Sequence, residues 1–455
     1  MQGEQSRDRE NKMGVMPVGR LLLSMSLPMM LSMLMLALYN VVDSMFVARI
    51  SEDALTALSM AFPVQNLMVA VATGLGVGLN AVLSRALGAK DKQSVDRAAA
   101  SGLLLEALGA LLFMLGGATL VRLFFEAQTD ITAIVENGIV YTRIIMLGCV
   151  GVFMQILFER LLQSTGRTVL TMASQATGAI INIVLDPILI FGLLGAPRMG
   201  VAGAALATVI GQWIGAGLGL FLNLRFNPEV SLSVKGLCPD AETVGRILTI
   251  GVPSVVMQSI GSVMTFTMNQ ILIAFSSTAV AVFGVYFKLQ SFVFMPVFGL
   301  NNGTVPIVAF NYGARRADRM MQAIRYTVIF AMSIMTLGAV VFNAFPGGLL
   351  GIFDASEEMM RIGLPALRII SLSFPVAGFC IGCGSVFQAL GHSFYSMITS
   401  LVRQLFVLIP CAYVLGRLSG DVTIVWWAFV IAEVVSLVLT VIFFRRVYEK
   451  VIKAV

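Results

Sequence analysis

The sequence predicts an all-α integral membrane protein with twelve transmembrane helices, arranged as two parallel, pseudo-symmetric halves of six helices each. Three observations predict this fold: a composition poor in charge, long apolar runs and an internal repeat. Charged residues make up 12% of the 455 residues, hydrophobic residues 58%, and the mean hydropathy is +0.91. Soluble domains carry about 25% charged residues. This chain therefore cannot cover its surface with polar groups, and lipid must be its solvent.

The apolar runs have the length of membrane-spanning helices. Only helices and closed barrels satisfy their backbone hydrogen bonds inside a bilayer. A helix needs roughly 20 apolar residues to cross, whereas a barrel strand needs ~10 residues of alternating polarity, and no such alternation is present. We expect spans at residues 20–48, 54–83, 94–121, 131–156, 168–194, 200–223, 246–275, 279–308, 320–346, 359–386, 394–416 and 422–445.

The basic residues predict the orientation. They gather in the N-terminal tail, at the C-terminus and in alternate connections, where the connection after the fourth span contributes Arg160 and Arg167. The opposite connections carry only Arg49, Arg122, Arg198, Arg361 and Arg417. By the positive-inside rule both termini are cytoplasmic, and we expect a multi-pass protein of the cell (inner) membrane. The charge thus reports topology and contact with anionic lipid, and we expect no nucleic-acid partner.

Identical residues recur at a spacing of 225 positions. The pairs include Pro28 and Pro253, Gln65 and Gln290, Gly74 and Gly299, Gly78 and Gly303, Gly88 and Gly313, and Gln163 and Gln388. Six helices per half is an even number, so both halves have the same orientation. The expected organisation is a tail at 1–19, an N-lobe at 20–224, a cytoplasmic linker at 225–245, a C-lobe at 246–446 and a tail at 447–455.

Duplicated halves in a membrane favour alternating access, with a cavity near the midplane where the halves meet. Duplication could also serve only to build a stable bundle. No soluble domain is left to do other work, and no Walker motif is present to hydrolyse ATP. We therefore expect a secondary transporter, not an enzyme, and no cofactor.

Two acids inside the predicted spans carry the functional prediction. Asp43 in the first span and Asp186 in the fifth lie at similar depth, near the outer ends of their helices. A charge at mid-bilayer costs at least ~2.5–3.5 kcal/mol. Tyr39 and Asn182 lie one turn away, and Pro187 leaves a carbonyl oxygen of its helix without a donor. Such oxygens can hold H⁺ or Na⁺; the alternative is that each acid pairs with a structural arginine or a helix terminus.

The second half differs from the first at these positions, because Met268 and Cys411 stand 225 residues after the two acids. We therefore expect ion handling in the N-lobe alone. Glu433, paired with Arg403 or Lys288, could be a structural brace or could contact substrate. Glu106 is expected to snorkel toward the cytoplasmic surface. The possible substrate cavity, with ordinary packing as the alternative, comprises Met35, Met257, Met264, Met268, Gln258 and Glu433.

The motif Asn182-Ile-Val-Leu-Asp186-Pro187, the run from Leu38 to Val47, the stretch from Gly200 to Thr208 and the loop from Gly88 to Asp91 resemble the multidrug and toxic compound extrusion (MATE) family. The resemblance covers nearly the whole chain and is closest to the branch of DinF-type and MepA-type bacterial transporters. It implies export of lipophilic, usually cationic compounds in exchange for H⁺ or Na⁺.

Matching this chain to the family's motifs also implies roles for single residues. The cation site would use Tyr39, Asp43, Asn182, Asp186 and Thr208, and the first helix would bend at Pro28. Some branches couple through an acid in the seventh helix, which this sequence lacks.

We expect a monomeric antiporter in contact with membrane lipid, with small lipophilic or cationic substrates and with H⁺ or Na⁺. The only metal ion that we expect is Na⁺, at Asp43, Asn182 and Asp186. One alternative is a flippase for lipid-linked intermediates, which would favour a cavity lined with arginine. Another is a different twelve-helix solute carrier of the major-facilitator type. Its loop between the second and third helices would read Asp-Arg-x-Gly-Arg-Arg, whereas residues 88–93 here read Gly-Ala-Lys-Asp-Lys-Gln.

Overall fold

The computed structural model describes residues 11–232, 239–353 and 355–454, and in these residues all regular secondary structure is helical. Ten of the described helices are long and apolar enough to cross a membrane, and two bent pairs raise the number of spans to twelve. Parts of the predicted N-terminal tail (1–10) and of the predicted linker (233–238) lie outside the described residues.

The first half consists of α1 (Lys12–Val15), α2 (Val18–Ala48), α3 (Glu52–Gly88), α4 (Lys92–Thr119), α5 (Val121–Glu126), α6 (Thr132–Leu147), α7 (Val150–Ser164), α8 (Thr168–Phe191), the short 3₁₀ helix η1 (Leu193–Gly195) and α9 (Val201–Phe226). We call the bundle formed by α2–α9 the N-lobe.

The second half consists of α10 (Ala241–Ile273), α11 (Ser277–Gly313), α12 (Ala317–Ala344), α13 (Pro346–Gly351), α14 (Glu357–Ser371), α15 (Phe374–Ala389), α16 (Ser393–Leu401), the π-helical η3 (Val402–Leu408), α17 (Ile409–Ser419), α18 (Val422–Val425), α19 (Trp427–Val447) and η4 (Tyr448–Ile452). We call this bundle the C-lobe.

Two of the predicted spans are broken rather than straight. The helices α6 and α7 meet at an angle of 44°, and α14 and α15 meet at 47°. At the first break an added Cβ on Gly148 would lie 2.5 Å from the Cγ1 atom of Val209, so only glycine lets the bend pack against α9. The helix α7 also continues to Ser164. The prediction that Arg160 lies in a connection was therefore wrong: it is inside the helix and only 9% exposed.

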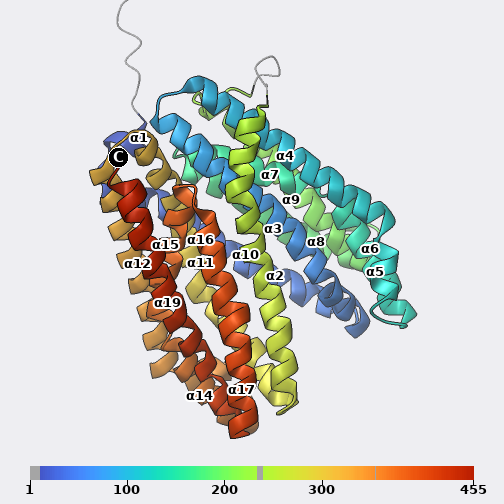
Figure 1. Cartoon of the computed structure of the whole chain (residues 1–455). Helices are drawn as coiled ribbons and strands as arrows, with labels where there is room; N and C mark the ends of the chain where they lie inside the picture. The colour runs from blue at the N-terminus through green and yellow to red at the C-terminus, as the bar shows by residue number, and fades with distance from the viewer. Residues whose placement is uncertain (1–10, 233–238, 354, 455) are drawn as a thin grey trace, which may run out of the picture.

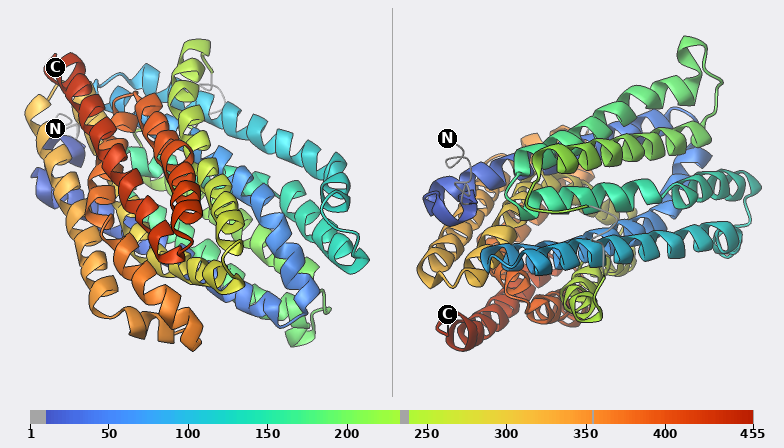
Figure 2. Two further views of the ribbon diagram at one scale, coloured as in Figure 1. Left: turned by 60° about the horizontal axis from the view of Figure 1, so that its bottom comes forward. Right: turned by 90° about the horizontal axis from the view of Figure 1, so that it is seen from above.

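The two lobes form the arms of a V (Figure 1). The N-lobe, coloured blue to green, and the C-lobe, coloured yellow to red, meet at the end that carries α1 and the C-terminus, and they spread toward the opposite end. Figure 2 shows the two lobes occupying separate sides of the molecule. We call the joined end the closed end and the other the open end.

The repeated glycines form the contacts between the lobes. The main inter-lobe pairs are α3 with α10 and α2 with α11, which the repeat relates to each other. An added Cβ on Gly78 would lie 2.3 Å from the Ile247 carbonyl oxygen, and one on Gly303 would lie 2.4 Å from Ser26 Oγ. These helices therefore touch backbone to backbone, which only a residue without a side chain permits.

The tightest contact lies at the closed end itself. A Cβ on Gly88 would be 1.9 Å from the carbonyl oxygen of Phe310, and one on Gly313 would be 2.0 Å from that of Arg85. The Arg85 guanidinium lies 4.5 Å from the centre of the Tyr312 ring, which adds a cation–π contact between the lobes.

The short helix α1 bridges both lobes at the closed end. Asn11, its N-cap, donates to the Thr165 carbonyl of the N-lobe at 3.0 Å and to Oε1 of Glu229, in the connection that follows α9, at 2.7 Å. From the C-lobe, Arg319 donates to the carbonyls of Met13 at 3.1 Å and Met16 at 2.6 Å. Polar contacts of α1 therefore hold the two lobes together where they meet.

Replacing Gly313 by alanine should open the closed end. Overpacking a tight contact costs about 1–3 kcal/mol, and each 1.4 kcal/mol changes an equilibrium about tenfold. Spin labels would be placed on the two lobes at the closed end, and double electron–electron resonance would measure the distances between them. We expect the fraction of molecules with the longer distance to be about tenfold larger in Gly313→Ala than in the unmodified protein. Gly284→Ala in the same helix is the control, since no atom lies within 4 Å of its added Cβ. Unchanged distances in Gly313→Ala would contradict this role of the glycine.

Candidate functional site

Close packing of α8 against α9 sets the position of the candidate site. An added Cβ on Gly211 would lie 2.6 Å from the Gly178 carbonyl oxygen, and one on Gly203 would lie 2.5 Å from that of Leu189. The two backbones therefore run in contact over much of their length. This packing brings Asn182 of α8 to Thr208 of α9, and the Asn182 amide donates to the Thr208 hydroxyl at 3.0 Å.

Asp43 and Asp186 lie together inside the N-lobe. Asp186 is 0% exposed, and neither of its carboxylate oxygens has a hydrogen-bond partner; the same holds for Oδ1 of Asp43. The two carboxyl groups lie close enough to interact, and because carboxylates only accept hydrogen bonds, only a proton on one of them would join them. The helix α2 supplies one acid and α8 the other, and these two helices pack directly against each other.

Two tyrosines surround the acids. Tyr39 lies one turn before Asp43, and its hydroxyl is within hydrogen-bonding reach of Thr208. Tyr141 of α6 interacts electrostatically with both acids and hydrogen-bonds Gln65 of α3 at 3.4 Å. The structure thus brings together all five predicted residues of the cation site.

Tyr141 was not predicted. Its phenol lies inside the fourth predicted span, and that position was the only signal available from the sequence.

No lysine or arginine in the described part of the chain interacts with Asp43 or Asp186. The alternative in which each acid is paired with a structural arginine therefore does not apply to this geometry. Two adjacent carboxyl groups in a low-dielectric interior repel each other when both are charged, so a shared proton or a bound monovalent cation stabilises them. The carbonyl oxygen of Asn182, also without a partner, can contribute a further ligand.

The helices that carry the acids continue through their prolines. The helix α2 is unbroken at Pro28, and α8 is unbroken at Pro187. Because Pro28 has no N–H, the Ser24 carbonyl loses its helical donor, and it accepts a long hydrogen bond of 3.5 Å from the Thr168 hydroxyl instead. The bend of α2 at Pro28 stays a prediction, because α2 is a continuous helix in this conformation.

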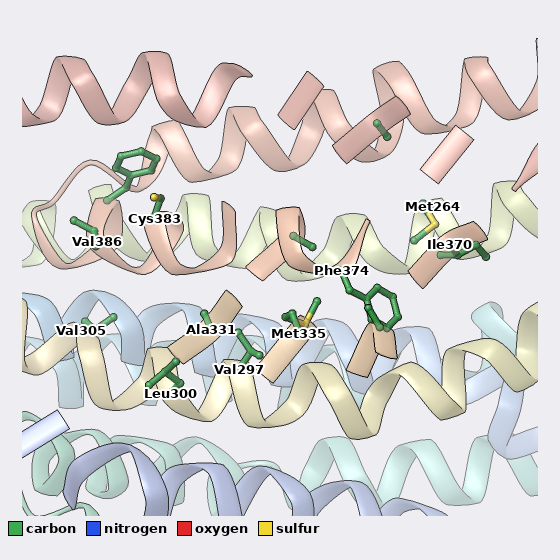
Figure 3. Packing of buried hydrophobic residues seen from close by; sticks show 14 of the residues in the cluster. Met264, Val297, Leu300, Val305, Ala331, Met335, Ile370, Phe374, Cys383 and Val386 are labelled. Carbon is green, nitrogen blue, oxygen red and sulfur yellow. The ribbon is translucent and has the colours of Figure 1, made fainter. Parts of the chain in front are cut away.

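The residues of the predicted substrate cavity lie in different environments. Met264 and Met268 are 7% and 0% exposed and belong to the C-lobe core, where Figure 3 shows Met264 among its neighbours. Gln258 is exposed and accepts a hydrogen bond from Thr73 across the lobes at 2.7 Å. Met35 and Met257 are partly exposed.

Glu433 is paired with Arg403 at 2.6 Å inside the C-lobe. Arg403 lies in the π-helical η3, and Oε2 of Glu433 has no partner. Lys288 lies elsewhere, with its Nζ 5.9 Å from the centre of the Phe353 ring. Of the two interpretations of Glu433, this geometry favours the structural brace.

If the pair is a brace, Arg403→Met should destabilise the protein by about 3–5 kcal/mol, because it leaves the buried Glu433 charge without a partner. The double variant Arg403→Met/Glu433→Met should recover most of this loss, since an apolar pair of similar volume is often neutral. Thermal unfolding in detergent and transport by the double variant measure both effects. Full stability without transport in the double variant would instead assign the pair to substrate.

Comparisons with known proteins agree with this architecture. The MatE family model matches residues 28–188 and 253–414, so its two matches begin 225 residues apart, as the internal repeat does. The multidrug export protein MepA of Staphylococcus aureus (strain MSSA476) is 25% identical over 421 residues, which cover 92% of this chain and 91% of MepA. MepA of Staphylococcus saprophyticus is 25% identical over 415 residues, which cover 90% of each chain.

Solved structures share the fold over nearly the full length. A structure described as the outward-facing conformation of a multidrug resistance MATE family transporter of the MOP superfamily has a TM-score of 0.92 at 24% identity, covering 98% of this chain and 99% of that one. A MOP superfamily transporter from Pyrococcus furiosus has a TM-score of 0.89 at 24% identity, covering 96% and 97%. Family match, relatives and fold agree along the chain, which therefore belongs to the MatE family of multi-pass membrane transporters.

Proposed function

We propose that this protein exports lipophilic, cationic compounds in exchange for H⁺ or Na⁺, and that Asp43 and Asp186 are the coupling site. The observation that carries the proposal is the pair of buried carboxyl groups without a cationic partner in the described residues. An exchangeable cation that neutralises the pair removes a cost of several kcal/mol in the membrane. The relatives named as multidrug export proteins support the choice of substrate class.

The closed end is the cytoplasmic end in this proposal. It carries most of the basic residues that flank the spans, including Lys92, Arg316 and Arg319 at the starts of α4 and α12 and Arg445 at the end of α19. By the positive-inside rule this end faces the cytoplasm, with the protein in the cell (inner) membrane. The V shape in Figure 1, with the lobes spread at the opposite end, then corresponds to the outward-facing state.

The exchange proceeds by alternating access. In the outward-facing state a proton or Na⁺ enters from outside and neutralises Asp43 and Asp186, while the substrate leaves from between the lobes. Once the acids are neutral, α2 bends at Pro28 and the N-lobe rearranges. The closed end then opens, and the cation is released to the cytoplasm. One-for-one exchange of a monovalent cation for a cationic substrate moves no net charge, so the H⁺ or Na⁺ concentration gradient drives it. A tenfold ion gradient is worth about 1.4 kcal/mol and supports a substrate gradient of about tenfold.

Two basic residues of the C-lobe, Arg403 and Lys288, disfavour the flippase alternative. A cavity for anionic headgroups needs cations that are free to bind them. Arg403 is neutralised by Glu433, and Lys288 lies over an aromatic ring. The outer faces of the lobes carry exposed apolar side chains such as Leu112 (70% exposed) and Phe406 (69% exposed), which fit direct contact of a monomer with lipid.

Asp43→Asn and Asp186→Asn should each abolish coupled transport while leaving the protein folded, since the amide keeps the shape but cannot exchange a proton or balance Na⁺. We expect uptake of a fluorescent lipophilic cation into proteoliposomes to fall by about a hundredfold, the order of loss caused when a required proton-transfer group is removed. Imposing first a pH gradient and then a Na⁺ gradient identifies the coupling ion.

Asp53→Asn is the matched control, because Asp53 is an exposed carboxyl at the start of α3. It should transport as the unmodified protein does. Undiminished gradient-driven uptake in both Asp43→Asn and Asp186→Asn would refute the assignment.

A further inference from the structure

The N-lobe holds a second group of buried acids that the coupling site does not use. Glu106 of α4 is 1% exposed, and neither of its carboxylate oxygens has a hydrogen-bond partner. The expectation that it snorkels to the surface was wrong. It lies one turn from Gly109, where α4 packs so closely on α7 that an added Cβ would be 2.6 Å from the Phe153 ring. Its side chain is therefore enclosed between helices.

Glu159 and Arg160 of α7 complete this group. Glu159 is 8% exposed and accepts a hydrogen bond from Gln155 Nε2 at 2.9 Å. The Arg160 guanidinium interacts electrostatically with both Glu106 and Glu159. Its stem lies against Gly76 of α3, where an added Cβ would be 2.9 Å from Arg160 Cγ.

The group contains two carboxyl groups and one guanidinium. No other charged side chain of the described residues interacts with either acid. Other ionisable side chains that the structure describes lie on the helices packed against α4 and α7: Asp53 and Arg85 of α3, Arg122 and Glu126 of α5, Glu136, Tyr141 and Arg143 of α6, Asp186 of α8, Arg225 of α9, Glu242 and Arg246 of α10, and Tyr286, Lys288 and Tyr312 of α11.

An uncompensated charge is costly in this environment. The group is therefore electrically neutral only when one of its two acids holds a proton. A metal cation is disfavoured beside Arg160, because the two positive charges would repel each other in a low dielectric.

We propose that Glu106, Glu159 and Arg160 form a second proton-binding site, which receives protons from the Asp43–Asp186 pair and releases them to the cytoplasm. This inference rests on the proposed function and selects H⁺ as its ion. In the transfer, an O–H bond breaks at Asp43 or Asp186 and another forms at Glu106 or Glu159, so one proton moves and no further reactant is consumed.

One polar residue, Gln155, lies between the two sites. Gln155, which donates to Glu159, lies in a gap left by two glycines: an added Cβ on Gly215 would be 2.8 Å from its amide, and one on Gly178 would be 3.4 Å from it. Gly178 in turn lies one turn before Asn182 of the coupling site. In this proposal the proton passes from the acid pair along α8 to Gln155 and then to Glu159.

The same group contacts the opposite lobe. Arg160 donates to Gln163 at 2.8 Å and to Asn302 of α11 at 3.1 Å, and Gln163 donates to the carbonyl of Asn302. These contacts cross from the N-lobe to the C-lobe only while the closed end is shut. Opening that end separates Arg160 from Asn302 and exposes the acids to cytoplasmic water, which allows the proton to leave.

Infrared spectroscopy of the full-length protein tests the site directly, because a protonated carboxyl has its own absorption band. In the Asp43→Asn/Asp186→Asn background, at neutral pH, we expect the band of one protonated carboxyl. Adding Glu106→Gln or Glu159→Gln should remove it, since either change leaves one carboxylate for one guanidinium. Either addition also keeps Arg160 neutralised, so the fold should survive. Two results would overturn the proposal. One is that Asp43→Asn/Asp186→Asn lacks the band. The other is that the band persists when Glu106→Gln is added and also when Glu159→Gln is added.

Transport separates this proposal from the proposed function. Glu106→Gln in the otherwise unmodified protein should lower pH-gradient-driven uptake by roughly tenfold or more, while substrate exchange at equal pH is retained. Glu126→Gln, an exposed acid of α5, is the matched control and should change neither rate. If Asp43→Asn stops transport but Glu106→Gln does not slow it, the second site fails alone. If Asp43→Asn and Asp186→Asn both transport normally, the proposed function fails, and the infrared result still decides whether the second site binds a proton.

Discussion

The repulsion between Asp43 and Asp186 inside the membrane is the constraint on which the rest of this structure depends. Both acids lie on apolar helices of one lobe, and among the described residues neither has a cationic partner. Helices α8 and α9 pack so closely beside them that an added Cβ on Gly203 or Gly211 would lie 2.5 Å or 2.6 Å from a backbone carbonyl oxygen. A tightly packed polar site of this kind is stable only when something neutral or positive completes it.

The two lobes solve the same problem in different ways. In the C-lobe the positions of the two acids hold Met268 and Cys411, and its buried acid, Glu433, is neutralised by Arg403 at 2.6 Å. An arginine is a cation fixed to the chain, whereas the N-lobe acids have no such partner among the described residues. This difference is the physical reason why the proposed function places the exchangeable cation in the N-lobe alone. The inter-lobe glycines, by contrast, are kept in both halves, because each half supplies one side of a symmetric contact.

The spans, the repeat and the acid site could be predicted from the sequence because each depends on a local and costly feature. Hydropathy over one helix predicts a span, and an acid within an apolar run needs a partner wherever it lies. Arg160 could not be placed in this way. A charge near the end of an apolar run can leave the membrane or stay inside, and the outcome depends on partners distant in sequence, here Glu106 and Asn302. The bend at Gly148 depends similarly on Val209 in another helix, and Tyr141 joins the site only through the packing of α6.

Substrate-induced release of cations from the purified protein tests the central claim most directly. Saturating substrate would be added to the unmodified protein and to the Asp43→Asn/Asp186→Asn variant, with proton release measured in lightly buffered solution and the release of radioactive sodium measured after sodium loading. We predict that the unmodified protein releases one of these two ions when it binds substrate and that the variant releases neither. Equal release from both proteins, or none from an unmodified protein that binds substrate, would contradict a coupling role for the two acids.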